Sequence, residues 1–429
     1  MKKMGKGAAL LLLLVAGYLL LGVAAWLMPD ASVRRHVEQT VAFGDMGEDY
    51  PKAIVHDHYG DMDPYMMDNY TDALILNQAL CLRSEGLKGM LLLPRHDEGM
   101  VQSQSLRHLL EGTDGGWISH YARYWHGTTY VARLLLVVTS YSGIRYLLYL
   151  CSSLLLLWCM IRLWRTLGWV RMAIIAFALM MVNVFVMQFS LQFVPVLMLA
   201  TGAIVWMTYH PAHDGGLAML TVGSLTVFFD LITVPTITLG LPLVVWVAMH
   251  RNEDWRKGLW HLVQLGLWWL AGYILTWMAK WGIATLVTGE NVFADAYGQS
   301  VYWSEGGNSY IGQAISTNLE MLHWKWVVVA LVALLAMVVW KPRAEGWKEA
   351  VRYLLLALIP FGYYVVMAHP AMHHAWYNYR ALVVAVAAVL MAATAMVDWE
   401  KIVKLKSEKG IPRRYRQTST GGLLPSKED

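Results

Sequence analysis

Ten apolar stretches divide this chain of 429 residues, and they restrict what it can fold into more than any other feature. Their approximate limits are Ala8–Met28, Ile144–Trp164, Met172–Met187, Val194–Tyr209, Gly216–Phe229, Pro235–Met249, Leu262–Leu286, Trp326–Trp340, Val351–Met367 and Ala381–Val397. A helix needs about 20 apolar residues to cross the ~30 Å hydrocarbon core of a bilayer. The pattern therefore predicts an all-α polytopic membrane protein with about ten transmembrane helices, although Gly216–Phe229 and Pro235–Met249 could instead form a re-entrant pair.

The composition also favours lipid over water as the solvent. Hydrophobic residues make up 57% of the chain and charged residues 15%, whereas soluble proteins average roughly 25% charged residues. The 21 Trp and 22 Tyr residues suit a protein with two membrane–water interfaces. Three cysteines define neither a disulfide framework nor a cysteine metal site. No glycine-rich nucleotide motif occurs, which argues against nucleotide-driven transport within this chain.

Lysine and arginine predict the orientation of the bundle. Three lysines precede the first apolar stretch, and four of the five short loops expected on the same side are rich in Lys or Arg. We therefore expect both termini in the cytoplasm, with the protein in the inner (plasma) membrane. The expected organisation is a retained first helix (1–28), a large extracytoplasmic loop (29–143), a transmembrane bundle (144–397) with a second outer loop (288–323), and a basic cytoplasmic tail (398–429).

The large first loop is acidic and contains helix signals. Between Arg34 and Arg123 it holds 14 acidic and 8 basic residues, a net charge of −6, so nucleic acid is not an expected partner. Residues Asp72–Leu82 are apolar at helical spacing, with Asp68 or Thr71 as a possible cap. Two further short helices are expected, at 102–111 and at 129–138, the second of which could lie in the plane of the membrane interface.

Four carboxylates of this loop are our candidates for catalytic groups: Asp45, Asp49, Asp68 and Asp72. A carboxylate just above a bilayer can act as a general base toward a hydroxyl group. It can also hold a divalent cation such as Mg²⁺ or Mn²⁺ through oxygen ligands. The alternatives are a solvated acidic loop and, for Asp68, a helix cap.

A dense group of donors follows at the end of the loop, in the segment SHYARYWHG at 119–127. Arg123 can bind phosphate oxygens through two parallel hydrogen bonds, and His126 can share the charge. Tyr124 and Trp125 offer aromatic faces on which a sugar ring could pack. Anchoring of the same aromatic residues among lipid headgroups is the alternative.

The segment HPAMHHAWYNYR at 369–380 is expected on the same face, between the last two apolar stretches. It supplies His373, His374, Tyr377, Tyr379 and Arg380 as donors, and no acidic residue accompanies them. Donors of this kind at a membrane edge predict an anionic ligand, with ordinary lipid headgroups as the alternative. The two adjacent histidines would point in different directions on a helix, so a zinc pair is not expected.

Ionisable residues inside apolar segments form the last group of candidates. Asp230 lies in FFDLITVPTITLGLP, where Pro and Gly residues predict broken helix around it. We expect it to contribute to ligand binding or to the local structure. Lys280 and Arg145 are placed similarly, and a buried ion pair or a side chain that reaches the interface is their structural alternative.

The arrangement resembles the GT-C class of membrane glycosyltransferases. Short stretches, DNYTDALILN, YARYWHG, FFDLITVPTITLGLP and HHAWYNYR, look like a bacterial group of GT-C-like membrane proteins. The resemblance implies a cytoplasmic start, a large first outer loop with helices along the membrane, and an essential acid in that loop. It implies a sugar donor on a polyprenyl phosphate or diphosphate, and an extracytoplasmic glycan or protein as the acceptor in cell-envelope synthesis. The compact acidic pair that is usual in the class is replaced here by Asp45 followed by Glu48 and Asp49.

Other functions are compatible with the same features. A transporter or lipid flippase for envelope precursors would use the intramembrane charges, but no internal repeat is visible. A polymerase or ligase of surface polysaccharide would typically carry its large outer loop later in the chain. A non-catalytic assembly partner of another transferase would need none of the acids.

Overall fold

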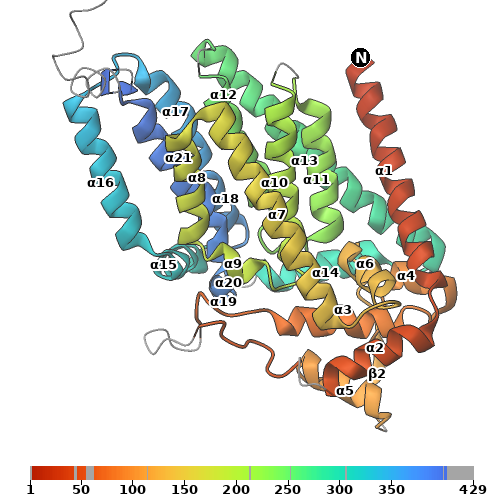
Figure 1. Cartoon of the computed structure of the whole chain (residues 1–429). Helices are drawn as coiled ribbons and strands as arrows, with labels where there is room; N and C mark the ends of the chain where they lie inside the picture. Colours follow the sequence, from red (N-terminus) through yellow and green to blue (C-terminus); the bar gives the residue numbers. More distant parts are fainter. Residues whose placement is uncertain are drawn as a thin grey trace, which may run out of the picture.

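The structure, a computed structural model, describes residues 2–42, 46–54, 62–113, 115–211, 214–251, 253–304, 307–399 and 401–402. These residues are mostly helical. A helical bundle forms the main body, and the helices of the first long loop gather against one end of it (Figure 1). One small antiparallel sheet of β1 (Arg95–Asp97) and β2 (Trp117–Ser119) lies within that loop, and Arg95 pairs with Ser119. The expectation of an all-α fold with short helices in the first loop is therefore confirmed.

The bundle consists of apolar helices. Its elements are α1 (Lys2–Leu27), α7 (Tyr141–Leu167), α8 (Trp169–Met181), α9 (Val184–Met187), α10 (Val194–Tyr209), α11 (Gly216–Phe229), α12 (Thr236–Met249), α13 (Trp255–Thr288), α16 (Trp324–Trp340), α17 (Gly346–Ala357), α18 (Ile359–Val366), η3 (Tyr379–Leu382) and α21 (Val383–Ala395). Within the described ranges, five helices are long and apolar enough to cross a membrane. The number is six if Ile311–Met321 and α16, which are joined at a sharp bend, form one span. Each of the ten expected stretches contains a helix of the bundle. Four of these helices, α8, α10, α11 and α12, are too short to count among the five long ones. That all ten cross a membrane stays a prediction.

The helices of the first loop form a compact layer at the bundle end. They are α2 (Asp30–Ala42), α3 (Asn69–Cys81), η1 (Gly86–Lys88), α4 (Gly89–Leu92), α5 (Gln102–Glu111) and α6 (Gly127–Leu135), with β1 (Arg95–Asp97) and β2 (Trp117–Ser119) between them. The periodicity predicted α3 and α5 well. The helix expected at 129–138 is α6, and it packs between α1 and α3 with most of its residues buried. Its position in the plane of a membrane interface stays a prediction.

Arg133 explains why α6 is buried. Its guanidinium donates hydrogen bonds to the carbonyl oxygens of Ala25, Met28 and Ala79, and it pairs with Asp30. The planar fork of an arginine can satisfy several carbonyl groups at once. One side chain thus joins the end of α1, the start of α2 and the end of α3.

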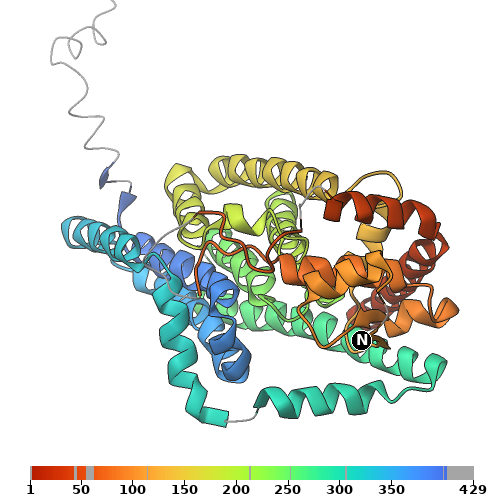
Figure 2. The same ribbon diagram turned by 90° about the horizontal axis from the view of Figure 1, so that it is seen from below.

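The second outer segment covers the neighbouring part of the same end. It contains α14 (Val292–Ser304), η2 (Gly307–Tyr310) and α15 (Ile311–Met321), and α15 packs on α19 (Ala368–His373) and α20 (Ala375–Asn378). Figure 2 shows this end from below, with α14 along one edge and α3 across the bundle. Between α15 and α16 the chain bends by 80°.

The opposite end of the bundle collects the start of α1 and the short basic loops (Figure 1). Lys3 forms an ion pair with Asp214 at 2.7 Å. Arg352 donates to the carbonyl oxygen of His250 at 3.3 Å, so two of these loops touch. The loops therefore alternate between the two ends as the charge pattern predicts. Their location in the cytoplasm stays a prediction, and most of the basic tail, from residue 403 on, lies outside the described residues.

Candidate functional site

Four segments that are separate in sequence come together at the loop end of the bundle. Tyr377 interacts electrostatically with Asp68 at the start of α3, with Asp230 after α11 and with Tyr121 before α6. Arg380 likewise interacts with Asp68, and Tyr124 interacts with Asp230. We call these residues the polar cluster: Asp68, Tyr121, Tyr124, Asp230, Tyr377 and Arg380. The structure thus brings together the acidic loop, the SHYARYWHG segment, the HPAMHHAWYNYR segment and Asp230.

Asp68 is the N-cap of α3. Its Oδ1 atom accepts a hydrogen bond from the Thr71 amide at 2.9 Å, so the predicted cap exists. The side chain is buried, and burial raises the pKa of Asp68 to about 6, against the lowering effects of the Thr71 hydrogen bonds and of Arg380. A carboxylate whose pKa lies near the working pH is suited to general base catalysis.

Asp72 lies one turn further along α3, but its surroundings differ. The Tyr141 hydroxyl donates to Oδ2 at 2.7 Å, and the Leu191 amide donates to Oδ1 at 3.0 Å. The side chain is fully buried, which raises its pKa to about 7. Because both oxygens already have partners, Asp72 connects α3 to α7 and to the turn before α10, and the geometry favours a structural role.

The two remaining candidate acids are less informative. Asp49 is half-buried, and its Oδ1 atom accepts from the Ser103 amide at 3.3 Å. It also interacts electrostatically with Asp68, which places it at the border of the polar cluster. Asp45 lies outside the described residues.

Arg123 is held in an ion pair. Its guanidinium lies 3.3 Å from the Asp295 carboxylate of α14 and 4.3 Å from the centroid of the Tyr121 ring. The backbone is fixed as well, because the Arg123 carbonyl accepts from the indole nitrogens of Trp277 and Trp281 on α13. Its Nη1 atom makes the contacts with Asp295, whereas its Nε atom has no hydrogen-bond partner among the described residues.

His126 has an unusual backbone and a buried ring. Its φ angle is +53°, a left-handed conformation that non-glycine residues rarely adopt. The Nε2 atom has no hydrogen-bond partner among the described residues. Burial and the nearby Lys280 and Arg123 hold the pKa of His126 well below its ordinary value. At neutral pH it can therefore supply a hydrogen bond but not a positive charge. The neighbouring Trp125 is buried, and its indole donates to the Thr276 carbonyl.

The histidines after α18 lie at the outer border of the cluster. His374 stacks on Tyr377 with ring centroids 5.3 Å apart, and burial is the main cause that lowers its pKa to about 4. His373 is exposed and faces His369, with centroids 4.6 Å apart. Of this pair only His374 therefore belongs beside the polar cluster.

Tyr379 and Arg380 hold the first loop onto the bundle. Both are fully buried, and both donate to the carbonyl oxygen of Pro64, at 3.1 Å and 3.3 Å. Arg380 also donates to the Trp376 carbonyl at 3.0 Å. Tyr379 and Arg380 were predicted to contact an anionic ligand, but their hydrogen bonds go to carbonyl groups of the protein. The charge of Arg380 acts on Asp68.

Asp230 closes the break between α11 and α12. Its carboxylate accepts from the amide and the hydroxyl of Thr233, and Gln192 donates to it at 3.4 Å. Ile232 has a φ angle of +63°, and the Tyr363 hydroxyl donates to its carbonyl at 2.8 Å. The break is therefore a fixed turn that holds Asp230 in the polar cluster.

Lys280 forms neither of the two structural arrangements expected for it, a buried ion pair or a side chain that reaches the interface. It is fully buried in α13, and its ammonium group donates to the Leu91 carbonyl at 2.6 Å. Within the described part of the chain it has no carboxylate partner, and it does not extend to the surface. Its charge lies 5.6 Å from the ring centroid of Trp125.

Tyr50, which lies beside the polar cluster, was not predicted as a site residue, and Tyr121 was included only as part of the SHYARYWHG segment, whereas Tyr124 and Tyr377 were predicted. Tyr50, Tyr121 and Tyr377 are half-buried, and Tyr50 lies 5.1 Å from Trp376 between ring centroids. Each offers an apolar face and a hydroxyl group, a combination suited to a polar ligand with flat apolar patches. The abundance of Tyr in the sequence was assigned to the membrane interfaces, and no local pattern marks Tyr50.

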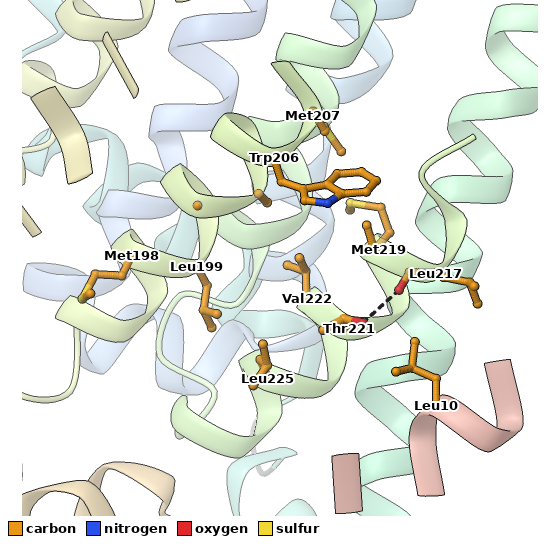
Figure 3. A pocket seen from close by; sticks show the side chains of 13 residues that line it. Leu10, Met198, Leu199, Trp206, Met207, Leu217, Met219, Thr221, Val222 and Leu225 are labelled. Carbon is orange, nitrogen blue, oxygen red and sulfur yellow. Dashed lines mark hydrogen bonds between the residues drawn. The ribbon is translucent and has the colours of Figure 1, made fainter. Parts of the chain in front are cut away.

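An apolar groove of about 470 Å³ lies between α1, α10 and α11. It follows α11 from Leu217 to Leu225, about 12 Å at 1.5 Å per residue. Figure 3 shows Trp206 and Leu199 of α10 facing Met219, Val222 and Leu225 of α11, with Leu10 of α1 at one edge. Leu225, the last residue of α11 that lines the groove, precedes Asp230 by five residues, about 7.5 Å along the helix axis at 1.5 Å per residue.

Among the described residues, no group of three or more His, Cys, Asp or Glu side chains is arranged to hold a metal ion. The divalent cation therefore stays a prediction. No family model, no curated protein and no solved structure matches this chain.

Proposed function

We propose that this chain is a multi-pass membrane glycosyltransferase of the GT-C type. It transfers a sugar from a polyprenyl phosphate or diphosphate to an acceptor hydroxyl outside the cytoplasm. The observation that carries the proposal is the contact between the first loop, the segment 369–380 and the Asp230 turn. Tyr50 lies 5.1 Å from Trp376 between ring centroids, and the Tyr363 hydroxyl joins Asn378 to the Thr233 carbonyl.

Asp68 is the proposed general base. The acceptor hydroxyl loses its proton to the Asp68 carboxylate, and its oxygen forms a bond to the anomeric carbon. The bond between that carbon and the phosphate oxygen breaks, and the phosphate leaves with the electron pair. A pKa of about 6 leaves Asp68 mostly ionised at pH 7 and still basic enough to take a proton. Attack opposite the leaving group inverts the anomeric carbon.

Arg123 is the proposed partner of the departing phosphate. Its ion pair with Asp295 is 3.3 Å long, and the Asp295 side chain is about half exposed, so the pair contributes little energy. A phosphate group carries more charge and more acceptor oxygens than a carboxylate, and it can therefore displace Asp295. Trp277 and Trp281 hold the Arg123 backbone in place during this exchange.

The groove and the tyrosines supply the remaining parts of a donor site. The apolar walls between α10 and α11 suit a hydrocarbon tail, and the groove ends near the polar cluster where the charged head would lie. The rings and hydroxyls of Tyr50, Tyr121 and Tyr377 suit a sugar. Lipid tail, phosphate and sugar would then be bound in this order along one path.

Transfer of labelled sugar in vitro tests the proposal. Purified protein is incubated with labelled lipid-linked sugars from cells that lack the protein, in which the donor is expected to accumulate. The Asp68→Asn variant is expected to lose about 10²- to 10⁴-fold in rate, the usual contribution of a general base. Its matched control is Asp254→Asn, because Asp254 is likewise an N-cap, at the opposite end of the bundle. Asparagine caps a helix as well as aspartate does, so loss of capping affects neither variant.

Each other result has a definite meaning. Wild-type rates in Asp68→Asn would remove this residue from the site. Movement of the lipid across proteoliposomes without any transfer would favour a flippase. Transfer that needs a second, co-purifying protein and survives Asp68→Asn would make this chain an assembly partner.

A further inference from the structure

A second cavity, of about 370 Å³, opens at the start of α7 and shares no residue with the polar cluster. The loop before α3, the first turns of α7 and the turn after α9 form its walls. Its lining residues are Ala53, Met67, Ser142, Arg145, Tyr146 and Phe189. Arg145 is the charged residue among them, and it therefore determines which ligand this cavity could bind.

Arg145 makes few strong contacts for a half-buried cation. Its Nη2 atom donates to the sulfur of Met67 at 3.4 Å, and its guanidinium faces the Tyr141 ring at 5.2 Å. A thioether is a weak acceptor, and a guanidinium has five N–H donors. Within the described ranges no carboxylate forms an ion pair with Arg145. Asp72 attracts it only at longer range, because Tyr141 and Leu191 occupy the Asp72 oxygens.

An exposed apolar stripe runs along α7 from this cavity. It consists of Leu147, Leu150, Leu154, Leu157 and Ile161, at spacings of three and four residues that place them on one helix face. Tyr146, at the border between cavity and stripe, is 70% exposed. The stripe is about 21 Å long at 1.5 Å per residue. This is longer than the hydrocarbon region of one leaflet, which is about 15 Å, half of the ~30 Å core.

We propose that this cavity binds the phosphate of an anionic membrane lipid, whose acyl chains lie along the α7 stripe. Arg145 supplies charge-assisted hydrogen bonds to the phosphate oxygens. A free phosphate ion would use the same donors, but it would leave the adjoining stripe unused, and we therefore commit to the lipid. The inference rests on the membrane location of α7 and not on glycosyl transfer.

Native mass spectrometry of delipidated protein in a neutral detergent tests the site. The probes are phosphatidylglycerol, diacylglycerol with the same chains and no phosphate, and inorganic phosphate. Wild-type protein is expected to bind one phosphatidylglycerol more tightly than diacylglycerol. Arg145→Gln is expected to weaken phosphatidylglycerol binding about 10- to 100-fold, the loss of roughly 1.5–3 kcal/mol for a hydrogen bond to a charged group.

Arg162→Gln is the matched control. Arg162 lies near the other end of α7, where it donates to the Thr208 carbonyl at 2.8 Å and lies 3.8 Å from the Tyr209 ring centroid. Because Arg162 lies outside the cavity and binds Thr208 through Nε and Nη2, phosphatidylglycerol binding is expected to stay within about twofold of wild type, far less than a lost charged hydrogen bond would cause.

Ala53→Phe keeps the test decisive if Arg145→Gln fails to fold. It fills the cavity from the loop side, leaves Arg145 and Asp72 unchanged, and is expected to lower phosphatidylglycerol binding without changing diacylglycerol binding. Equal phosphatidylglycerol affinity in wild type and both cavity variants would overturn the proposal. Displacement of the lipid by millimolar inorganic phosphate would also overturn it, because the site would then be one for a soluble anion.

Discussion

Two carboxylates on one helix show how the role of an acid depends on its partners. Asp68 and Asp72 are one turn apart on α3, both are buried, and burial raises the pKa of each. Asp68 is bonded within its own helix cap and faces the polar cluster. Asp72 has two donors from other elements. A buried carboxylate whose acceptor positions are occupied by other elements stabilises the fold, as in Asp72, whereas proton uptake by Asp68 belongs to the function proposed above.

Tyr141→Phe tests the structural role of Asp72. The change removes a donor from a buried carboxylate, so we expect a loss of about 1.5–3 kcal/mol in the free energy of unfolding. The measurement is thermal or denaturant unfolding in detergent. Tyr146→Phe, on the exposed face of the same helix, should be near neutral. Loss of transfer by Tyr141→Phe with unchanged stability would instead point to Asp72 as a catalytic group.

The pH dependence of transfer tests Asp68. Because its pKa is raised from 3.8 to about 6, the folded protein binds this proton more tightly than the unfolded chain does. As pH rises from about 4 to above 6, Asp68 loses its proton, and its contribution to the free energy of unfolding is lost. Activity is gained over the same pH range, because the ionised carboxylate is the proposed base. We expect kcat/KM to rise about tenfold per pH unit below 6 and to level off above it. Thr71→Val removes a hydrogen bond that lowers the pKa, so the profile should move to higher pH. If the pH profile of Thr71→Val is the same as that of the wild type, the group that titrates in the profile is not Asp68.

At the scale of elements, short helices and their breaks position the site. The chain between α11 and α12 turns at Asp230, and the Tyr363 hydroxyl holds this turn. The α8–α9 break occurs at Asn183, whose φ angle is +53°. Polar side chains at such breaks satisfy backbone groups that a continuous helix would satisfy itself. The bundle thereby carries irregular backbone and polar groups at one end.

Gly202→Phe tests the groove between α10 and α11. Gly202 lines the groove, and open space surrounds the position of an added Cβ atom, so a larger side chain fits without backbone strain. We expect the KM for a long-chain polyprenyl donor to rise about tenfold, the equivalent of 1.4 kcal/mol, with little change for a short-chain donor. Gly17→Phe is the matched control, because Gly17 is an exposed helical glycine of α1 with open space around it. Equal effects of both variants, or none, would exclude the groove as the tail site.

At the scale of the whole molecule, the two ends of the bundle differ in chemistry. One carries the acidic first loop with the polar cluster, and the other carries the short basic loops (Figure 1). A membrane between these ends would place the acids and the Lys/Arg-rich loops on opposite sides, in agreement with the positive-inside rule.

Cysteine labelling tests this topology. In a variant without Cys81, Cys151 and Cys159, single cysteines are introduced as Ser300→Cys at an exposed position of α14 and as Lys348→Cys in α17, where the lysine side chain is 37% exposed. Because a charged maleimide does not cross the bilayer, it should label Ser300→Cys in cells whose inner membrane is intact. It should label Lys348→Cys only after that membrane is permeabilised. Labelling of both positions from outside would contradict the proposed orientation.

Local properties made much of the architecture predictable. Apolar length located each bundle helix, and the cap at Asp68 with the following periodicity located α3. The alternation of basic loops predicted which loops share an end. The small β1–β2 sheet and α2 escaped prediction, because neither has a strong periodic pattern, and the buried position of α6 depends on Arg133 contacts with three other segments.

The sequence by itself therefore determined the helices, their order and the alternation of their ends, since these depend on hydropathy and charge along short stretches. Only the tertiary structure decided what the candidate residues do. Asp72 receives one donor from 69 positions away and another from 119, and Tyr379 reaches Pro64 across 315 positions. Hydrogen-bond partners of this kind settle whether a buried polar group is already satisfied or still available to a ligand, and no local pattern contains them.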